Sequence, residues 1–146
     1  MVDIKYQSPN FTEQDACSIA EEQYGLQVSA RQLPGERDQN FYLKASNGKE
    51  FVLKIAYSAE DRDLLELQNK VMGLLARGAP GLSIPRVCAT KSKKSITTVS
   101  GNNDVSYLVR LLTYVPGKLL AHVKPHTPEL LHSLGHVLGT IDTSLL

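Results

Sequence analysis

With 146 residues, of which 42% are apolar and 21% charged, the chain has the size and composition of one globular domain. Its 16 Lys and Arg residues nearly balance its 15 Asp and Glu residues, and the net charge of +1 gives no support to a nucleic-acid-binding or membrane-surface protein. The first ten residues lack the apolar core of a signal peptide, and no window approaches the roughly 18 apolar residues of a membrane span. Cys17 and Cys88 are far apart and in no metal-binding spacing. We therefore expect a reduced, cytoplasmic protein that binds neither nucleic acid nor membranes.

The first half of the chain predicts one helix followed by three antiparallel strands. Thr12 is a suitable helix cap, an acidic residue follows three positions later, and Gly25 ends the helix. Alternating side chains predict strands at 26–30 and 39–45. An Asn-Gly turn then leads to a strand at 50–56, which completes a short antiparallel meander.

The second half predicts a helix, further strands and a last helix. In chain order we expect a helix at 58–77, a strand pair or one irregular strand at 86–90 and 95–99, a turn at 101–104, an apolar strand at 105–114, and a helix from about 127 to the last residue. A long helix inserted within an antiparallel sheet predicts the α+β class. The last helix carries an apolar stripe with no later element to pack on, formed by Leu130, Leu131, Leu134, Val137, Leu138 and Ile141.

Lys54 is the most informative residue of the chain. It lies near the end of the apolar run Phe51-Val52-Leu53-Lys54-Ile55, where a charged group is costly unless something pairs with it. The simplest structural interpretation is a lysine that extends from a strand end to reach solvent. The functional interpretation is an anion-binding lysine.

Several segments together resemble a known family. They are Asp38-Gln39-Asn40-Phe41, the run that contains Lys54, Glu66-Leu67-Gln68-Asn69 and, above all, the long stretch from Ser106 to Gly117. The chain resembles the N-terminal lobe of the aminoglycoside phosphotransferase family, which has the protein-kinase-like fold, and is most similar to kinases of hydroxylysine and their bacterial relatives. The resemblance implies a five-stranded antiparallel sheet with an inserted helix and an N-terminal helix. It also implies a lobe with a hinge at 1–117 and the first helix of a truncated C-terminal lobe at 118–146.

The same resemblance implies roles for individual residues. Lys54 would pair with the α- and β-phosphates of ATP or GTP, and the loop with Gly35, Asp38 and Asn40 would cover them. On the residues alone, this loop is equally compatible with an ordinary hairpin. The segment from Leu112 would hold the base: the Thr113 carbonyl would accept a hydrogen bond from it, the Val115 amide would donate one, and Leu112 would flank the pocket. The structural interpretation of that segment is a strand end followed by a Pro-Gly turn, and both interpretations can be true together.

Kinase-like folds pair the strand lysine with an acidic residue of the inserted helix, which leaves Glu66 and Gln68 as candidates. At about 100° per residue the two side chains lie roughly 200° apart. The expected apolar face includes Gln68 and is otherwise formed by Leu64, Val71, Met72 and Leu75. Helix geometry therefore favours Gln68 as the inward group and leaves Glu66 in solvent.

Catalysis in this family depends on an Asp in a His-x-Asp-type loop and on a later metal-binding Asp. No His-x-Asp occurs here, and Asp142 is the only aspartate after Asp104. We therefore expect a nucleotide-binding lobe that is inactive alone and works with Mg²⁺ only in a full-length protein that supplies the missing lobe. Four histidines from His122 to His136 give no convincing metal site.

Three functional hypotheses remain open. The first is a piece of a small-molecule phosphotransferase that acts on the hydroxyl of an amino compound such as hydroxylysine. The second is the same region within a fusion to a class III aminotransferase, which would bind pyridoxal phosphate. The third is a non-catalytic module for nucleotide sensing or interaction. In each case the exposed stripe of the last helix predicts self-association.

Overall fold

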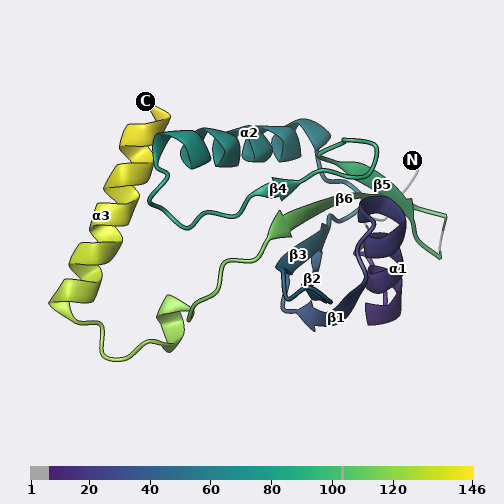
Figure 1. Ribbon diagram of the computed structural model, residues 1–146, viewed down its shortest axis with the longest axis horizontal. Helices are drawn as coiled ribbons and strands as arrows, with labels where there is room; N and C mark the ends of the chain where they lie inside the picture. Colours follow the sequence, from purple (N-terminus) through teal and green to yellow (C-terminus); the bar gives the residue numbers. More distant parts are fainter. Residues whose placement is uncertain (1–6, 103) are drawn as a thin grey trace, which may run out of the picture.

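The computed structural model describes residues 7–102 and 104–146, and the order of its elements is the predicted one (Figure 1). The expectation about the first ten residues lies largely outside this part, as does Asn103 of the predicted turn at 101–104. The helices are α1 (Glu13–Tyr24), α2 (Arg62–Gly78) and α3 (Pro128–Leu145), with a short 3-10 helix, η1, at Leu120–His122. The strands are β1 (Val28–Leu33), β2 (Gln39–Ala45), β3 (Glu50–Ile55), β4 (Val87–Cys88), β5 (Thr97–Ser100) and β6 (Ser106–Thr113).

The strands form one antiparallel sheet in the order β1-β2-β3-β6-β4, with β5 also paired to β6. β3 pairs with β6 along one of its edges. Along the other edge, β4 lies opposite Leu112 and Leu111, and β5 lies opposite residues 106–109. The two short strands therefore act as one irregular strand, interrupted by a loop, and not as a pair. The sheet has six hydrogen-bonded segments in the five positions that were expected.

The main core lies between α1 and one face of the sheet. Thr12 caps α1 through a capping box with Asp15, as the sequence indicates. The helix buries Ala16, Ile19 and Ala20 against one face of the sheet. The side chains on that face are those of Phe41, Leu43, Leu53, Ile55, Val109 and Leu111. The side chains that alternate with these along the strands project from the opposite face, which α1 does not cover.

On that second side lies α2, whose start and rotation both differ from the expectation. It begins at Arg62, four residues later than predicted, because Asp61 is its cap and accepts a hydrogen bond from the Asp63 amide. Its buried residues are Leu65 and Leu75, whereas Leu64 is 45% exposed. The predicted inward face is therefore wrong at Leu64, whose place is taken by Leu65, and confirmed at Leu75.

α3 stands apart from the sheet and contacts the end of α2 (Figure 1), where Ser144 lies against Gly78. None of the α3 residues is buried, and Leu131, Leu134 and Leu138 of its apolar stripe are 51%, 37% and 54% exposed. No helix in the described ranges is long and apolar enough to cross a membrane.

Candidate functional site

Three polar side chains lie in a row across the middle of the sheet. Lys54 of β3 is opposite Asn40 of β2 on one side and opposite Arg110 of β6 on the other. Opposite residues of antiparallel strands project to the same face. Because the α1 core takes the neighbouring residues Phe41, Leu53 and Leu111, this row lies on the other face of the sheet.

Lys54 is a half-buried cation whose one side-chain hydrogen bond among the described residues goes to a neutral amide. Its Nζ donates to the Asn40 side-chain oxygen at 3.0 Å. Burial lowers the pKa of Lys54, the Asp38 carboxylate opposes this by raising it, and the Arg110 charge lowers it further. The site therefore disfavours the ammonium ion as it stands, and an added anion would relieve that cost.

The loop between β1 and β2 is folded tightly beside Lys54. A Cβ atom at Gly35 would lie 2.4 Å from the Asp38 carbonyl oxygen and 3.0 Å from the Asn40 side-chain nitrogen, so this path requires glycine. The Asp38 carboxylate accepts a hydrogen bond from the Tyr57 amide at 3.2 Å, which ties the loop to the segment after β3. The predicted loop residues therefore lie together with Lys54.

A cleft of about 470 Å³ opens at this point, and its lining joins the loop to the entrance of α2. It is lined by Glu36, Arg37, Asp38, Asn40, Lys54, Tyr57, Glu60 and Leu64. Three of these residues, Asp38, Asn40 and Lys54, are sequence candidates. The sequence reasoning missed Tyr57 and Glu60, and neither carries a signal that stands out from an ordinary loop.

The lining of the cleft includes the carboxylates of Glu36, Asp38 and Glu60. Among the described residues, no three His, Cys, Asp or Glu side chains gather closely enough to hold a metal ion. We therefore name no metal ligand and route no step through Mg²⁺. What the cleft offers an anion is the Lys54 ammonium, the Arg37 guanidinium and the backbone of the tight loop.

Arg110 is the functional candidate that the sequence reasoning missed. It is only 4% exposed, and its guanidinium donates to the Gln68 side-chain oxygen at 2.8 Å, to the Asn69 side-chain oxygen at 2.8 Å and to the Leu65 carbonyl at 3.4 Å. Burial lowers the pKa of Arg110, while the charges of Asp38 and Glu60 oppose the shift. The argument that singled out Lys54, a charge inside an apolar strand, applies equally to Arg110.

The expected pairing of Lys54 with α2 is not formed. Gln68 does turn toward the sheet, as helix geometry favoured, but its partner is Arg110. Glu66 is exposed and lines a different pocket with Asn69 and Lys70. The physical reason is that Arg110 stands beside Lys54 and reaches the helix first, with a forked donor that suits two side-chain oxygens.

The segment expected to hold a base follows directly from β6. Leu112 is buried and lies opposite Val52, two residues from the Arg110–Lys54 pair and on the same face. The Thr113 amide donates to the Arg86 carbonyl at 2.8 Å, and the Arg86 amide donates to the Thr113 hydroxyl at 2.9 Å rather than to its carbonyl. Val115 follows beyond the strand. Neither Thr113 nor Val115 lines the cleft around Lys54.

The chain is similar in sequence to curated kinases of small molecules. Hydroxylysine kinase of Bos taurus is 37% identical over 148 residues, which cover 94% of this chain and 39% of that protein. Hydroxylysine kinase of Danio rerio is 36% identical over 146 residues, which cover 97% of this chain and 41% of that protein. The chain thus spans about two fifths of the length of these relatives.

Solved structures show the same fold at low identity. A microcompartment-associated aminopropanol kinase matches with a TM-score of 0.68 and 15% identity over 89% of this chain and 39% of its own. An amicoumacin kinase, solved in complex with AMP-PNP, Ca²⁺ and Ami, matches with a TM-score of 0.60 and 17% identity over 74% of this chain and 32% of its own.

The family assignment follows from one further comparison. The model of the phosphotransferase enzyme family, which is the aminoglycoside phosphotransferase (APH) family, matches residues 29–144. This range contains the Lys54 cleft, the Arg110 anchor and the segment after β6. The chain therefore belongs to the phosphotransferase enzyme family and has its kinase-like fold.

Proposed function

We propose that this chain is the nucleotide-binding lobe of a small-molecule phosphotransferase. The observation that carries the proposal is the position of Lys54, a half-buried cation at a cleft closed by a tight glycine loop. The α- and β-phosphates of ATP or GTP fit that charge. The base extends toward Leu112, the Thr113 carbonyl and the Val115 amide. Support for the Thr113 role comes from the Arg86 amide, which bonds to the hydroxyl and not to the carbonyl.

The acceptor is a hydroxyl group of an amino compound such as hydroxylysine. The hydroxylysine kinases that match nearly the whole chain support this choice. The lobe alone does not transfer phosphate, because the sequence has no His-x-Asp to act on the attacking hydroxyl and the described residues include no group of three metal ligands. The missing C-terminal lobe supplies those groups and most of the acceptor site.

Nucleotide titration tests the phosphate role of Lys54. We expect fluorescent ATP and GTP analogues to bind the wild-type chain, and Lys54→Ala to weaken binding about tenfold or more, since a charge-assisted hydrogen bond is lost. Lys44→Ala is the matched control, because Lys44 is an exposed lysine of β2 outside the cleft. Equal affinity of the wild type and Lys54→Ala would contradict the proposal.

An acceptor assay tests the claim that the lobe is inactive. The 146-residue chain is incubated with ATP, Mg²⁺ and hydroxylysine, and ADP release is followed. We expect no release above the rate without acceptor, even at nucleotide concentrations that saturate the lobe. Acceptor-dependent release would show that the described residues are sufficient for transfer.

The apolar stripe of α3 is the contact surface for the rest of the enzyme, and in the isolated chain it leads to self-association. The support is the exposure of Leu131, Leu134 and Leu138 on a helix with no buried residue. We expect light scattering to give a mass above that of the monomer for the wild type. The double variant Leu134→Glu/Leu138→Glu is expected to be monomeric, and an unchanged mass would refute this part.

A further inference from the structure

A second concave surface, separate from the Lys54 cleft, runs between α2 and residues 87–98. It consists of two adjoining cavities of about 510 and 560 Å³ that share Ser95 in their linings. Arg62, Lys70 and Arg77 of α2 form one wall, and residues 93–98 with Val87 form the other. None of these residues lines the Lys54 cleft. We call this surface the basic groove.

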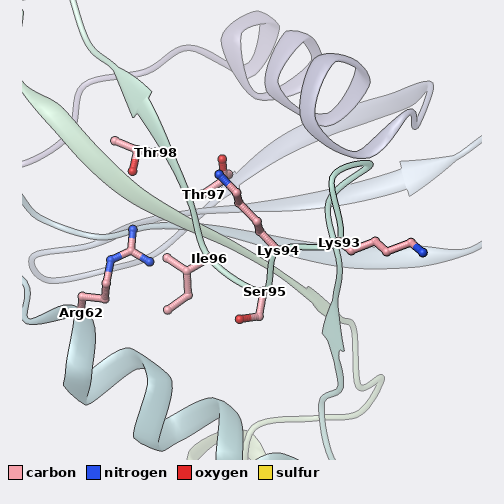
Figure 2. A pocket seen from close by; sticks show the side chains of 7 residues that line it. All are labelled: Arg62, Lys93, Lys94, Ser95, Ile96, Thr97 and Thr98. Carbon is pink, nitrogen blue, oxygen red and sulfur yellow. The ribbon is translucent and has the colours of Figure 1, made fainter.

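The basic groove concentrates positive charge in a chain that is nearly neutral overall. It holds five cations, Arg62, Lys70, Arg77, Lys93 and Lys94, and the single carboxylate of Glu66, whereas the net charge of the whole chain is +1. All five cations are exposed, and within residues 7–102 and 104–146 their side chains make no hydrogen bond or ion pair. Figure 2 shows Arg62 and Lys94 on either side of Ile96, while Lys93 extends away from them.

The loop that carries Lys94 has a defined shape. Thr90 is 5% exposed; its hydroxyl accepts from the Lys94 amide at 3.0 Å, and its amide donates to the Lys94 carbonyl at 2.9 Å. Lys93 between them takes a φ of 63°, a conformation rare for residues other than glycine. The charges of the loop wall are therefore presented from a fixed backbone.

The basic groove has apolar residues in its lining, mainly in the second cavity, and its length exceeds that of a small anion. Ile96 is 4% exposed, and Val87 and Leu74 line the second cavity. Sixteen residues of α2, from Arg62 to Arg77, span about 24 Å. An extended chain of about seven residues has that length. In such a chain alternate side chains point to opposite sides, so one set meets the apolar lining residues and the other meets the cations.

The amide of Asn69 also belongs to the basic groove. Its oxygen accepts from Arg110, and its nitrogen is buried with no hydrogen-bond partner among the described residues. An unpaired buried donor is unfavourable. Because Asn69 lines the second cavity, a backbone carbonyl bound there is a candidate acceptor for this nitrogen.

We propose that the basic groove binds an extended acidic segment of a partner protein. The length of the groove, its unpaired cations and its apolar lining residues fit a chain of alternating acidic and apolar residues better than a single phosphate group. The two sites share no lining residue, so the segment and the nucleotide can be bound at the same time.

The test uses a fluorescein-labelled heptapeptide that alternates glutamate with leucine, titrated into the 146-residue chain and followed by fluorescence anisotropy. We expect the peptide to bind. The counterpart with glutamine in place of glutamate should bind with an affinity lower by about tenfold or more. Affinity should fall with added salt, because exposed charges are screened. Amide chemical shifts should change in α2 and residues 87–98 and not in the loop at 35–40.

Charge reversal in and outside the groove decides whether the site is specific. Lys70→Glu/Lys94→Glu should weaken peptide binding about tenfold or more. Lys44→Glu/Lys118→Glu makes the same change in net charge at two exposed lysines outside the groove and should change affinity less than about twofold. No peptide binding, equal losses in both double variants, or tighter binding of an oligo-dT strand than of the peptide would each overturn the proposal.

Discussion

Replacement of Arg110 by methionine tests whether the guanidinium holds α2 on the sheet. Two of its hydrogen bonds are 2.8 Å long, to Gln68 and Asn69, and each charge-assisted bond contributes about 1.5–3 kcal/mol. Gln68 is exposed and regains water when the bond is lost, and removal of the charge also relieves repulsion from Lys54. We therefore expect Arg110→Met to lower the free energy of unfolding by about 2 kcal/mol.

Urea unfolding followed by circular dichroism measures this change, and hydrogen exchange locates it. Amides of α2 should exchange faster in Arg110→Met, while those of α1 keep their relative protection. Lys54→Met is the matched control: it removes the neighbouring cation, whose pKa burial already lowers, and should leave the fold equally or more stable. An Arg110→Met variant as stable as the wild type would show that burial of the guanidinium offsets its bonds, as happens for some buried charges.

Three further predictions concern the loop glycine Gly35, the pKa of Lys54 and the α1 cap Thr12. Gly35→Ala should lower stability by about 1–3 kcal/mol and weaken nucleotide binding, because its Cβ would meet the Asp38 carbonyl at 2.4 Å, whereas Gly81→Ala, with open space around it, should do neither; urea unfolding and nucleotide titration compare the two. The lowered pKa of Lys54 means that between this pKa and 10.5 the unfolded chain binds more protons than the folded one. Stability should therefore rise with pH in that window while nucleotide affinity falls, and Lys54→Met should show neither trend. Thr12→Ala should cost about 1 kcal/mol by removing the capping box of α1, and thermal unfolding would detect it.

The parts of the fold that could be predicted are those fixed by local chemistry. The α1 cap needs only Thr12 and Asp15, and β2 has its predicted bounds because alternation and the Asn-Gly turn define both of its ends. β1 was misplaced by two or three residues, since its extent is set by pairing with β2 as far as Leu33 and Asn40. Pairing between distant strands leaves no local pattern.

The structure brings together some of the candidate residues, and their role in binding a nucleotide stays a prediction. Lys54, Asp38 and Asn40 lie at one cleft, and Gly35 shapes its loop. The choice between Glu66 and Gln68 as partner of Lys54 failed because it assumed that Lys54 was the only charge on that face. The cross-strand register places Arg110 beside Lys54, and no reasoning within a single helix or strand contains that information.

The use of neutral partners for Arg110 has a consequence for Lys54. Gln68 and Asn69 hold α2 through amide oxygens, so no carboxylate of the helix neutralises the charge on the sheet and Lys54 remains available to phosphates. Gln68→Glu would introduce that carboxylate beside Arg110. We expect it to raise the free energy of unfolding, measured in urea, by about 1 kcal/mol, because a carboxylate pairs with Arg110 more strongly than an amide does. We also expect it to weaken nucleotide binding several-fold, because the new negative charge repels the phosphates. Glu66→Gln, the reciprocal change at the exposed neighbour, should alter neither quantity. If Gln68→Glu strengthened the fold and left nucleotide affinity unchanged, the Arg110 anchor and the Lys54 site would be electrostatically independent.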